Sequence, residues 1–263
     1  MSFAGKRVLA LESRRAAEMA ELIRKQGGEP FVAPALREAP IEQNREAFAF
    51  AERLFAGGYD MIVLLTGVGT RQLNRLLATR YPEAAFADAL RRLTVVARGP
   101  KPAAALRELG LAPALTAPEP NTWREVLRVT EGRPERRIAV QEYGRSNPDL
   151  LRALGERGAE ATSVRVYQYA LPEDTGPLRE AARRLAAGDF QIALFTSAVQ
   201  IEHLMTVAED SPATLEALTR LKIGSIGPTT TEALGEFGLA PWMEPSHPKM
   251  GLLVREAAER GEG

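Results

Sequence analysis

Short aliphatic runs recur along the chain, and an amphipathic stretch follows most of them. Seven of these runs predict strands, at residues 8–11, 61–65, 94–97, 138–140, 164–169, 192–195 and 223–226. Their residues do not alternate with polar ones, which is typical of strands that are buried on both faces of a parallel sheet. The pattern therefore favours α/β domains over an antiparallel sandwich.

The stretches between the runs have helical spacing. Apolar residues stand at i, i+3 and i+4 in Met19/Leu22/Ile23 and again in Leu73/Leu76/Leu77, as on the buried face of a surface helix. Proline follows a capping or flexible residue at Asn147-Pro148 and Gly227-Pro228, which marks helix starts. The alternation of strand and helix predicts doubly wound parallel sheets of the flavodoxin-like or Rossmann-like kind.

The chain contains an internal repeat. Residues 95–113 and 223–241 are identical at nine of nineteen positions with an offset of 128, and residues 60–77 match 190–207 in pattern with an offset of 130. A looser pair joins 7–34 to 137–172. The repeats predict two related domains. They allow a single domain boundary near residue 130. They also allow two crossovers between domains, at the proline-marked stretches 34–40 and 167–172, and these would build one domain from both chain ends.

Composition narrows the function classes. The 263 residues suit two domains, and the 34 basic residues balance the 34 acidic ones, so no whole-molecule field attracts nucleic acid or an anionic membrane. No apolar run approaches membrane-spanning length, and no signal segment opens the chain; we expect a cytoplasmic protein. Cysteine is absent, which excludes disulfides and thiolate chemistry.

Four predicted helix starts follow the carboxyl ends of predicted strands, at Thr66, Gly99, Thr196 and Gly227. Free backbone N–H groups and the helix dipole favour anions there, and ligands of open α/β sheets bind at this edge. Ser and Thr are equally common as simple helix caps, so both interpretations stay open. The turn at Thr66 begins like a dinucleotide motif, but Gln72 stands at the third glycine position, so the G-x-G-x-x-G pattern fails.

Most other catalytic patterns are missing. His203 and His247 are the only histidines and have no partner at metal-ligand spacing, and Ser197 lies six residues from His203 on one predicted helix, which disfavours a serine hydrolase. Tyr167 is a neutral hydroxyl donor at pH 7 or else an aromatic residue of a hinge. Arg14 follows the first strand, where its side chain faces either solvent or a cleft.

Several segments together resemble the uroporphyrinogen-III synthase family, and they cover nearly the whole chain. They are Phe195-Thr196-Ser197-Ala198, Ser225 to Thr230 with Ala233-Leu234 and Gly238-Leu239 after it, Asn147-Pro148 with Leu150-Leu151 and Leu154, and Val166-Tyr167-Gln168 ahead of Pro172. No one motif is specific, but their order and spacing are.

The resemblance implies two α/β domains joined by two extended linker strands. One domain would combine 1–35 with 172–263, the other would span 36–171, and the cleft between them would be the active site. The implied reaction is that of a cyclising hydro-lyase: hydroxymethylbilane loses water, ring D is inverted through a spiro intermediate, and uroporphyrinogen III forms without metal or organic cofactor. Contact with hydroxymethylbilane synthase and a monomeric state are further expectations.

The resemblance makes Tyr167 the candidate general acid for the leaving hydroxyl. The candidate substrate contacts are Arg14, Thr66, Gly67, Gly99, Lys101, Gly144, Thr196, Ser197, Ala198, Gly227, Thr229 and Thr230. The substrate carries eight carboxylates, which helix N-termini suit. The family's usual Thr-Arg-Pro after the first strand is replaced by Leu11-Glu12-Ser13, and Thr66-Gly67 replaces its Thr-Ser.

Two other classes remain as alternatives. A nucleotide-dependent enzyme of the same architecture would need the third glycine that Gln72 replaces. A bilobal small-molecule binding protein would also have two crossovers, but such proteins are usually exported.

Overall fold

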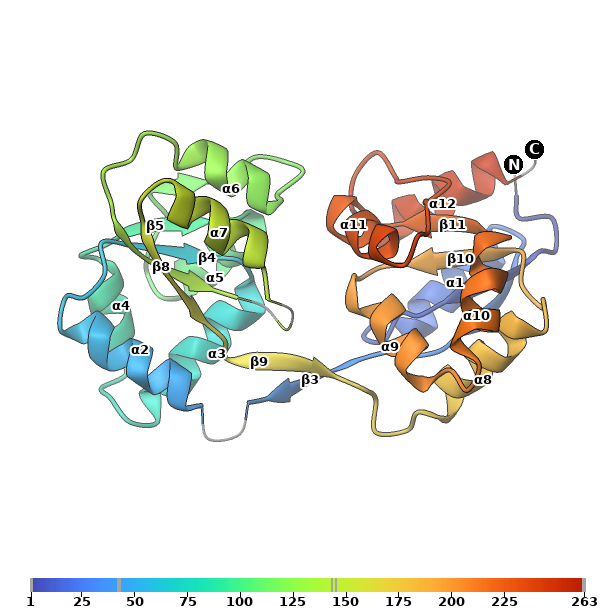
Figure 1. Cartoon of the computed structure of the whole chain (residues 1–263), viewed down its shortest axis with the longest axis horizontal. Coiled ribbons are helices and arrows are strands. Elements are labelled where there is room, and N and C mark those ends of the chain that lie inside the picture. The colour runs from blue at the N-terminus through green and yellow to red at the C-terminus, as the bar shows by residue number, and fades with distance from the viewer. Residues whose placement is uncertain (1, 42–43, 143, 145, 262–263) are drawn as a thin grey trace. The chain divides into compact units, whose positions relative to one another are not determined.

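The computed structural model describes residues 2–41, 44–142, 144 and 146–261. Internal contacts divide the chain into two compact units, unit 1 made of residues 1–37 and 170–263 and unit 2 made of residues 38–169 (Figure 1). No helix of the described residues is long and apolar enough to cross a membrane.

Unit 1 is built on a four-stranded parallel sheet in the order β11-β10-β1-β2. The strands are β1 (Arg7–Ala10), β2 (Glu29–Val32), β10 (Ile192–Phe195) and β11 (Lys222–Ser225). Every residue of β10 is buried, as its unbroken aliphatic run predicts. The sheet therefore needs helices on both faces.

Helices cover both faces of this sheet. Leu9 and Phe195 pack with one set of helices, namely α8 (Gly176–Ala186), α9 (Val199–Val207), α10 (Ser211–Thr219) and α11 (Pro228–Glu236). Val8 and Leu194 face the other way and pack with α1 (Ala16–Lys25) and α12 (Met250–Arg260). The expected doubly wound arrangement is confirmed.

Unit 2 contains a five-stranded parallel sheet in the order β6-β5-β4-β7-β8. Its strands are β4 (Met61–Leu64), β5 (Thr94–Ala97), β6 (Leu115–Thr116), β7 (Arg137–Gln141) and β8 (Glu160–Val164). One face packs with α2 (Arg45–Phe55), α3 (Gly67–Ala78), α4 (Ala85–Leu90) and α5 (Pro100–Glu108). The other packs with α6 (Trp123–Val129) and α7 (Pro148–Glu156).

The sequence repeat has a structural counterpart. The strand order β11-β10-β1-β2 of unit 1 matches β5-β4-β7-β8 of unit 2. Unit 2 adds β6, which pairs Leu115 with Val96, and unit 1 has an isolated parallel bridge at the equivalent place, between Met243 and Gly224. The offset of 128 residues read from the sequence therefore relates two copies of one α/β unit.

One predicted strand is wrong. The run 164–169 divides into the end of β8 at Val164 and a separate strand β9 (Tyr167–Ala170). The reason is pairing: β8 pairs with β7 in the sheet of unit 2, whereas β9 pairs with β3 (Arg37–Pro40) in a two-stranded sheet. Both strands lie where the chain passes from one unit to the other, so the proline-marked stretches are the crossovers.

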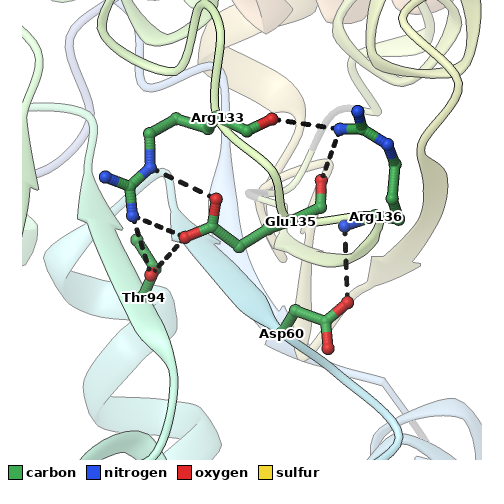
Figure 2. A network of polar contacts seen from close by, with 5 residues as sticks. All are labelled: Asp60, Thr94, Arg133, Glu135 and Arg136. Carbon is green, nitrogen blue, oxygen red and sulfur yellow. Dashed lines mark hydrogen bonds and ion pairs between the residues drawn. The ribbon is translucent and has the colours of Figure 1, made fainter.

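The amino ends of the unit 2 strands are joined by charged side chains (Figure 2). Asp60, just before β4, accepts hydrogen bonds from the backbone N–H groups of Arg136 and Arg137, at 3.3 and 3.0 Å, and pairs with the Arg137 side chain. Glu135 accepts a hydrogen bond from the Thr94 hydroxyl. Hydrogen bonds from Arg137 lower the pKa of Asp60 to about 2. This network fastens β4 to β7 at the edge opposite the helix starts.

Candidate functional site

Each sheet has one point where its connections diverge. In unit 1 the chain leaves β1 toward β2 and leaves β10 toward β11, so the switch point lies between the carboxyl ends of β1 and β10. In unit 2 it lies between β7 and β4. Ligands of open α/β sheets bind at such points, and most of the candidate residues stand beside one of them.

Tyr167 is held at the switch point of unit 2. Its hydroxyl oxygen lies 3.4 Å from Oγ1 of Thr66 and accepts a hydrogen bond from the backbone N–H of Gly144. Its ring meets the edge of Tyr169 at a centroid distance of 5.7 Å. Tyr167 is only 1% exposed, and this burial, followed by the neighbouring Tyr169, raises its pKa well above the usual value. The hydroxyl therefore keeps its proton throughout the neutral range.

Thr66 caps helix α3. Its Oγ1 accepts a hydrogen bond from the backbone N–H of Gly69 at 3.0 Å, and its own N–H donates to Oε1 of Gln141 at 3.4 Å. The cap interpretation of this turn is thus present in the structure. The same hydroxyl also reaches Tyr167.

The glycines of the Thr66 turn make room for protein atoms. A Cβ on Gly67 would lie 2.5 Å from the backbone oxygen of Lys101, at the start of α5. A Cβ on Gly69 would clash with the side-chain amide of Gln141. Close packing inside unit 2 accounts for both, which agrees with the failure of the dinucleotide motif.

Close packing also explains why residue 144 is a glycine. A Cβ there would lie 2.6 Å from the backbone nitrogen of Tyr169 and 2.5 Å from its ring. Only glycine lets this backbone approach β9 closely enough for its N–H to reach Tyr167.

The start of α5 offers fewer donors than expected. Pro100 and Pro102 have no N–H, so only Lys101 supplies an amide among these three positions. Gly99 is buried, and a Cβ there would lie 2.5 Å from the side-chain amide of Asn121. The Lys101 side chain is exposed. If this turn binds an anion, its ammonium group is the main donor.

In unit 1 a glutamine occupies the switch point. Oε1 of Gln200 accepts hydrogen bonds from the N–H groups of Thr196 and Ser197, at 2.7 and 3.1 Å, and its Nε2 donates to the backbone oxygen of Leu11 at 2.8 Å. Ala198, next in the turn, is buried. Two of the amides that the sequence offers to a ligand here, those of Thr196 and Ser197, are therefore already hydrogen-bonded within the chain.

The carboxylate of Glu12 lies beside the turn at Thr196. Oε2 of Glu12 accepts a hydrogen bond from the Thr196 hydroxyl at 2.6 Å, and Oε1 accepts from the N–H groups of Arg14 and Arg15, at 3.0 and 3.2 Å. Arg14 itself is exposed. Glu12 thus occupies the turn where the family usually has Thr-Arg-Pro.

The start of α11 is the fourth turn. Gly227 is its N-cap and Pro228 its first residue, and the N–H groups of Thr230 and Thr231 bond to the Gly227 oxygen at 3.0 and 3.1 Å. Among the described residues the Thr229 N–H has no such partner. Thr230 is buried and Thr229 half-buried. This turn keeps a donor for a ligand.

Within each unit, the structure brings several of the candidate site residues together. In unit 2 it brings Thr66, Gly144 and Tyr167 together, and packs Gly67 against Lys101. In unit 1 the turn at Thr196 adjoins the turn at Gly227, because the Ile226 N–H bonds to the Phe195 oxygen at 2.9 Å. No group of three His, Cys, Asp or Glu that could hold a metal ion occurs in the described part of the chain.

Four polar residues at the two switch points escaped sequence reasoning: Glu12, Gln141, Glu142 and Gln200. Each follows or lies near the end of a strand, and two of them form the pair Gln-Glu directly after an aliphatic run. Two polar residues directly after a buried strand are unusual, and this pattern could have marked Gln141 and Glu142 as site residues.

Comparisons with known proteins agree with these features. The family described as Uroporphyrinogen-III synthase HemD matches residues 17–255. Crystal structures of uroporphyrinogen III synthase from the extremely thermophilic bacterium Thermus thermophilus are similar: a triple mutant has a TM-score of 0.74 at 28% identity, covering 98% of this chain and 99% of that one. The wild type in a second crystal form has a TM-score of 0.58 at 30% identity, with 98% of each chain covered.

A curated Bacillus subtilis protein, the uncharacterized protein YjjA, is 28% identical over 97% of this chain and 96% of its own length. The family match spans most of the chain, and the resemblance inferred from the sequence is confirmed. The chain belongs to the uroporphyrinogen-III synthase family.

Proposed function

We propose that this enzyme, a cyclising hydro-lyase, converts hydroxymethylbilane to uroporphyrinogen III, with Tyr167 as the proton donor to the leaving hydroxyl. One observation carries the assignment of Tyr167: a buried hydroxyl, protonated in the neutral range, is held by Thr66 and Gly144 at a switch point. Neither the nucleotide-dependent enzyme nor the binding protein is favoured by the family match.

The chemistry balances around this hydroxyl. The C–O bond of the hydroxymethyl group breaks as the pyrrole nitrogen donates electrons, and the proton of Tyr167 leaves with the hydroxide as water. The resulting azafulvenium carbon is attacked by the substituted carbon of ring D, which gives the spiro intermediate. The bond from that ring D carbon to the carbon bridging rings C and D then breaks, and the unsubstituted α carbon of the turned ring D attacks the freed bridging carbon to close the macrocycle. The C–H proton lost on closure restores the Tyr167 hydroxyl. General-acid help of this kind contributes about 10²- to 10⁴-fold.

Substrate carboxylates need local donors because the chain has no net charge. We assign these contacts to the turns at Thr66, Lys101, Thr196 and Thr229, whose helix starts offer amides, hydroxyls or an ammonium group. The N–H groups of Thr229 and Lys101 make no hydrogen bond to another described residue, which supports the turns at these two residues. At Thr196 a carboxylate of the substrate would have to compete with Gln200 and Glu12.

Folding the bilane is the second task. Spontaneous closure gives the uninverted isomer, so the protein must bring ring D to the reactive carbon before that closure occurs. Holding two reacting carbons in place can supply several kcal/mol. We infer that contacts from both units restrict the flexible substrate in this way, and that the enzyme works as a cytoplasmic monomer supplied by hydroxymethylbilane synthase.

The test is Tyr167→Phe with freshly prepared hydroxymethylbilane. We expect kcat to fall about 10²-fold or more, because the leaving hydroxyl loses its proton donor, and the share of isomer I to rise as spontaneous closure competes. The isomers are separated by chromatography after oxidation. A variant with the turnover and isomer ratio of the wild type would contradict the role of Tyr167.

A further inference from the structure

Two polar residues that water does not reach stand at the end of β7: Gln141 is its last residue and Glu142 follows directly. Gln141 and Glu142 are both 0% exposed. Buried amide and carboxylate groups cost free energy unless their hydrogen bonds are satisfied. The mechanism above uses neither side chain directly.

Gln141 reaches one neighbour of Tyr167. Its Oε1 accepts the hydrogen bond from the Thr66 N–H at 3.4 Å, and its Nε2 donates to the backbone oxygen of Glu142. The absent side chain of Gly69 leaves the space that the amide fills. Gln141 thereby fixes the turn whose hydroxyl lies 3.4 Å from the Tyr167 hydroxyl.

Glu142 lies near Gly144 in the chain, and Gly144 is the second polar neighbour of the Tyr167 hydroxyl. Its carboxylate accepts hydrogen bonds from the Asn147 N–H at 2.8 Å, from the Ser163 hydroxyl at 2.5 Å and from the Ser146 hydroxyl at 3.2 Å. Asn147 caps α7 and Ser163 belongs to β8. Gly144 lies between Glu142 and these anchors, and its N–H donates to the Tyr167 hydroxyl.

We propose that Gln141 and Glu142 are positioning residues for Tyr167: Gln141 acts through Thr66 and Glu142 acts through Gly144. The proposal rests on the proposed function of Tyr167. Together the two side chains fix two of the polar contacts of this hydroxyl, those with Thr66 and Gly144, beside its third contact with the Tyr169 side chain, and so help to set the direction in which it offers its proton.

Unit 1 supplies a comparison. It also has a glutamine amide between its central strand ends, but that amide comes from Gln200 on α9. The residue equivalent to Glu142 is Glu12, which is half-buried and binds the turn at Thr196. A glutamine at the switch point is therefore common to both units, whereas the fully buried carboxylate belongs to the unit that contains Tyr167.

The experiment uses Gln141→Leu and Glu142→Gln in the full chain labelled with 3-fluorotyrosine. The fluorine resonance of residue 167 is identified by its loss in Tyr167→Phe. We expect both variants to shift or broaden this resonance, to lower kcat for hydroxymethylbilane about 10- to 100-fold with KM changed less than about threefold, and to raise the share of isomer I. A misplaced proton donor affects the chemical step more than binding.

Gly69→Ala is a further variant in case Gln141→Leu does not fold, because it places a methyl group against the Gln141 amide. Its matched control is Gly155→Ala in α7, where a Cβ meets nothing within 4 Å; we expect the resonance and kcat to stay as in the wild type. Gln200→Leu tests the glutamine of unit 1 and should leave the resonance of residue 167 unchanged.

Folded Gln141→Leu and Glu142→Gln proteins with an unchanged resonance and an unchanged kcat would overturn the positioning proposal. Its failure is distinguishable from failure of the proposed function. If Tyr167→Phe kept full activity while the resonance still moved in both variants, the contacts would be correct and the proton-donor role wrong.

Discussion

At the scale of single residues, the environment of Tyr167 fixes the protonation state of its hydroxyl. Burial disfavours the phenolate and raises the pKa, so the hydroxyl remains protonated. Thr66 and Gly144 lie against the same oxygen without adding a charge. The hydroxyl is thus a permanently protonated hydrogen-bond donor at neutral pH, although its raised pKa makes it a weaker acid than a solvent-exposed tyrosine.

Glu12 places a carboxylate in the Thr196 turn, which is one of the turns proposed to bind substrate carboxylates. Its carboxylate holds the N–H groups of Arg14 and Arg15 and the hydroxyl of Thr196. We predict that Glu12→Gln lowers KM for hydroxymethylbilane about 2- to 10-fold, because like-charge repulsion is removed while a hydrogen-bond acceptor remains. Steady-state kinetics measures this.

The control for this prediction is Glu18→Gln on the exposed side of α1, where the carboxylate pairs with Arg15 in solvent. It should leave KM unchanged. A raised KM in Glu12→Gln would mean that Glu12 supports the turn rather than competing with the substrate.

At the scale of elements, the packing of α3 against α5 depends on Gly67. A methyl group there would lie 2.5 Å from the backbone oxygen of Lys101, which cannot move aside as a flexible side chain can. We predict that Gly67→Ala lowers the free energy of unfolding by about 1–3 kcal/mol, measured by urea denaturation.

Gly235→Ala in α11 is the matched substitution, since a Cβ there meets nothing within 4 Å. It should leave stability unchanged or raise it by up to about 1 kcal/mol, because alanine is the better helix former. Equal losses in both variants would show that the α3–α5 contact is not the cause.

The ends of β4 and β7 give a prediction about pH. The pKa of Asp60 is lowered to about 2 in the folded state, chiefly by the Arg137 side chain, against about 3.9 in an unfolded chain. A lowered carboxylate pKa stabilises the fold above the unfolded value, and this contribution is lost as the pH falls from about 4 to about 2.

Asp60→Asn should therefore cost about 1 kcal/mol at pH 7, allowing for partial exposure of the pair, and the difference from the wild type should shrink below about pH 4 and disappear only below about pH 2. Asp88→Asn removes a more exposed pair with Arg91 and should change little. Urea denaturation across this pH range measures both. A cost that stays constant with pH would contradict the ionic origin.

Element prediction from sequence succeeded where strands are buried on both faces and failed where they are not. The runs that became β4, β5 and β10 have no polar alternation and were predicted within one residue. Neither β2, whose residues are half-buried or exposed, nor β6, which has two residues, is among the seven predicted strands, although the looser repeat over 7–34 ends in a β-rich run where β2 lies. The break between β8 and β9 depends on which strand each one pairs with, and that is tertiary information.

The site was predictable only in part, for a similar reason. Turns after aliphatic runs can be read from the sequence, and so can a threonine cap such as Thr66. The partners that Gln200 and Glu142 find are far apart in the chain, for example Leu11 and Ser163. The spacing of residues in the sequence cannot show which backbone N–H groups already donate hydrogen bonds to side chains of the protein.

At the scale of the whole molecule, one α/β unit occurs twice and the two copies have diverged in what they present. Unit 2 contains Tyr167, whose hydroxyl contacts Thr66, and the buried pair Gln141-Glu142. Unit 1 fills its own switch point with Gln200 and Glu12 and keeps the Thr229 amide available. In the proposed function, acid chemistry belongs to one copy and part of the carboxylate binding to the other.

The central claim is that the protein directs the closure of the bilane. The most direct measurement is the isomer composition of the product when purified enzyme meets fresh hydroxymethylbilane. The account predicts that isomer III dominates and that its share rises with enzyme concentration as the spontaneous reaction is outrun. A product that is isomer I alone, at every enzyme concentration, would contradict it.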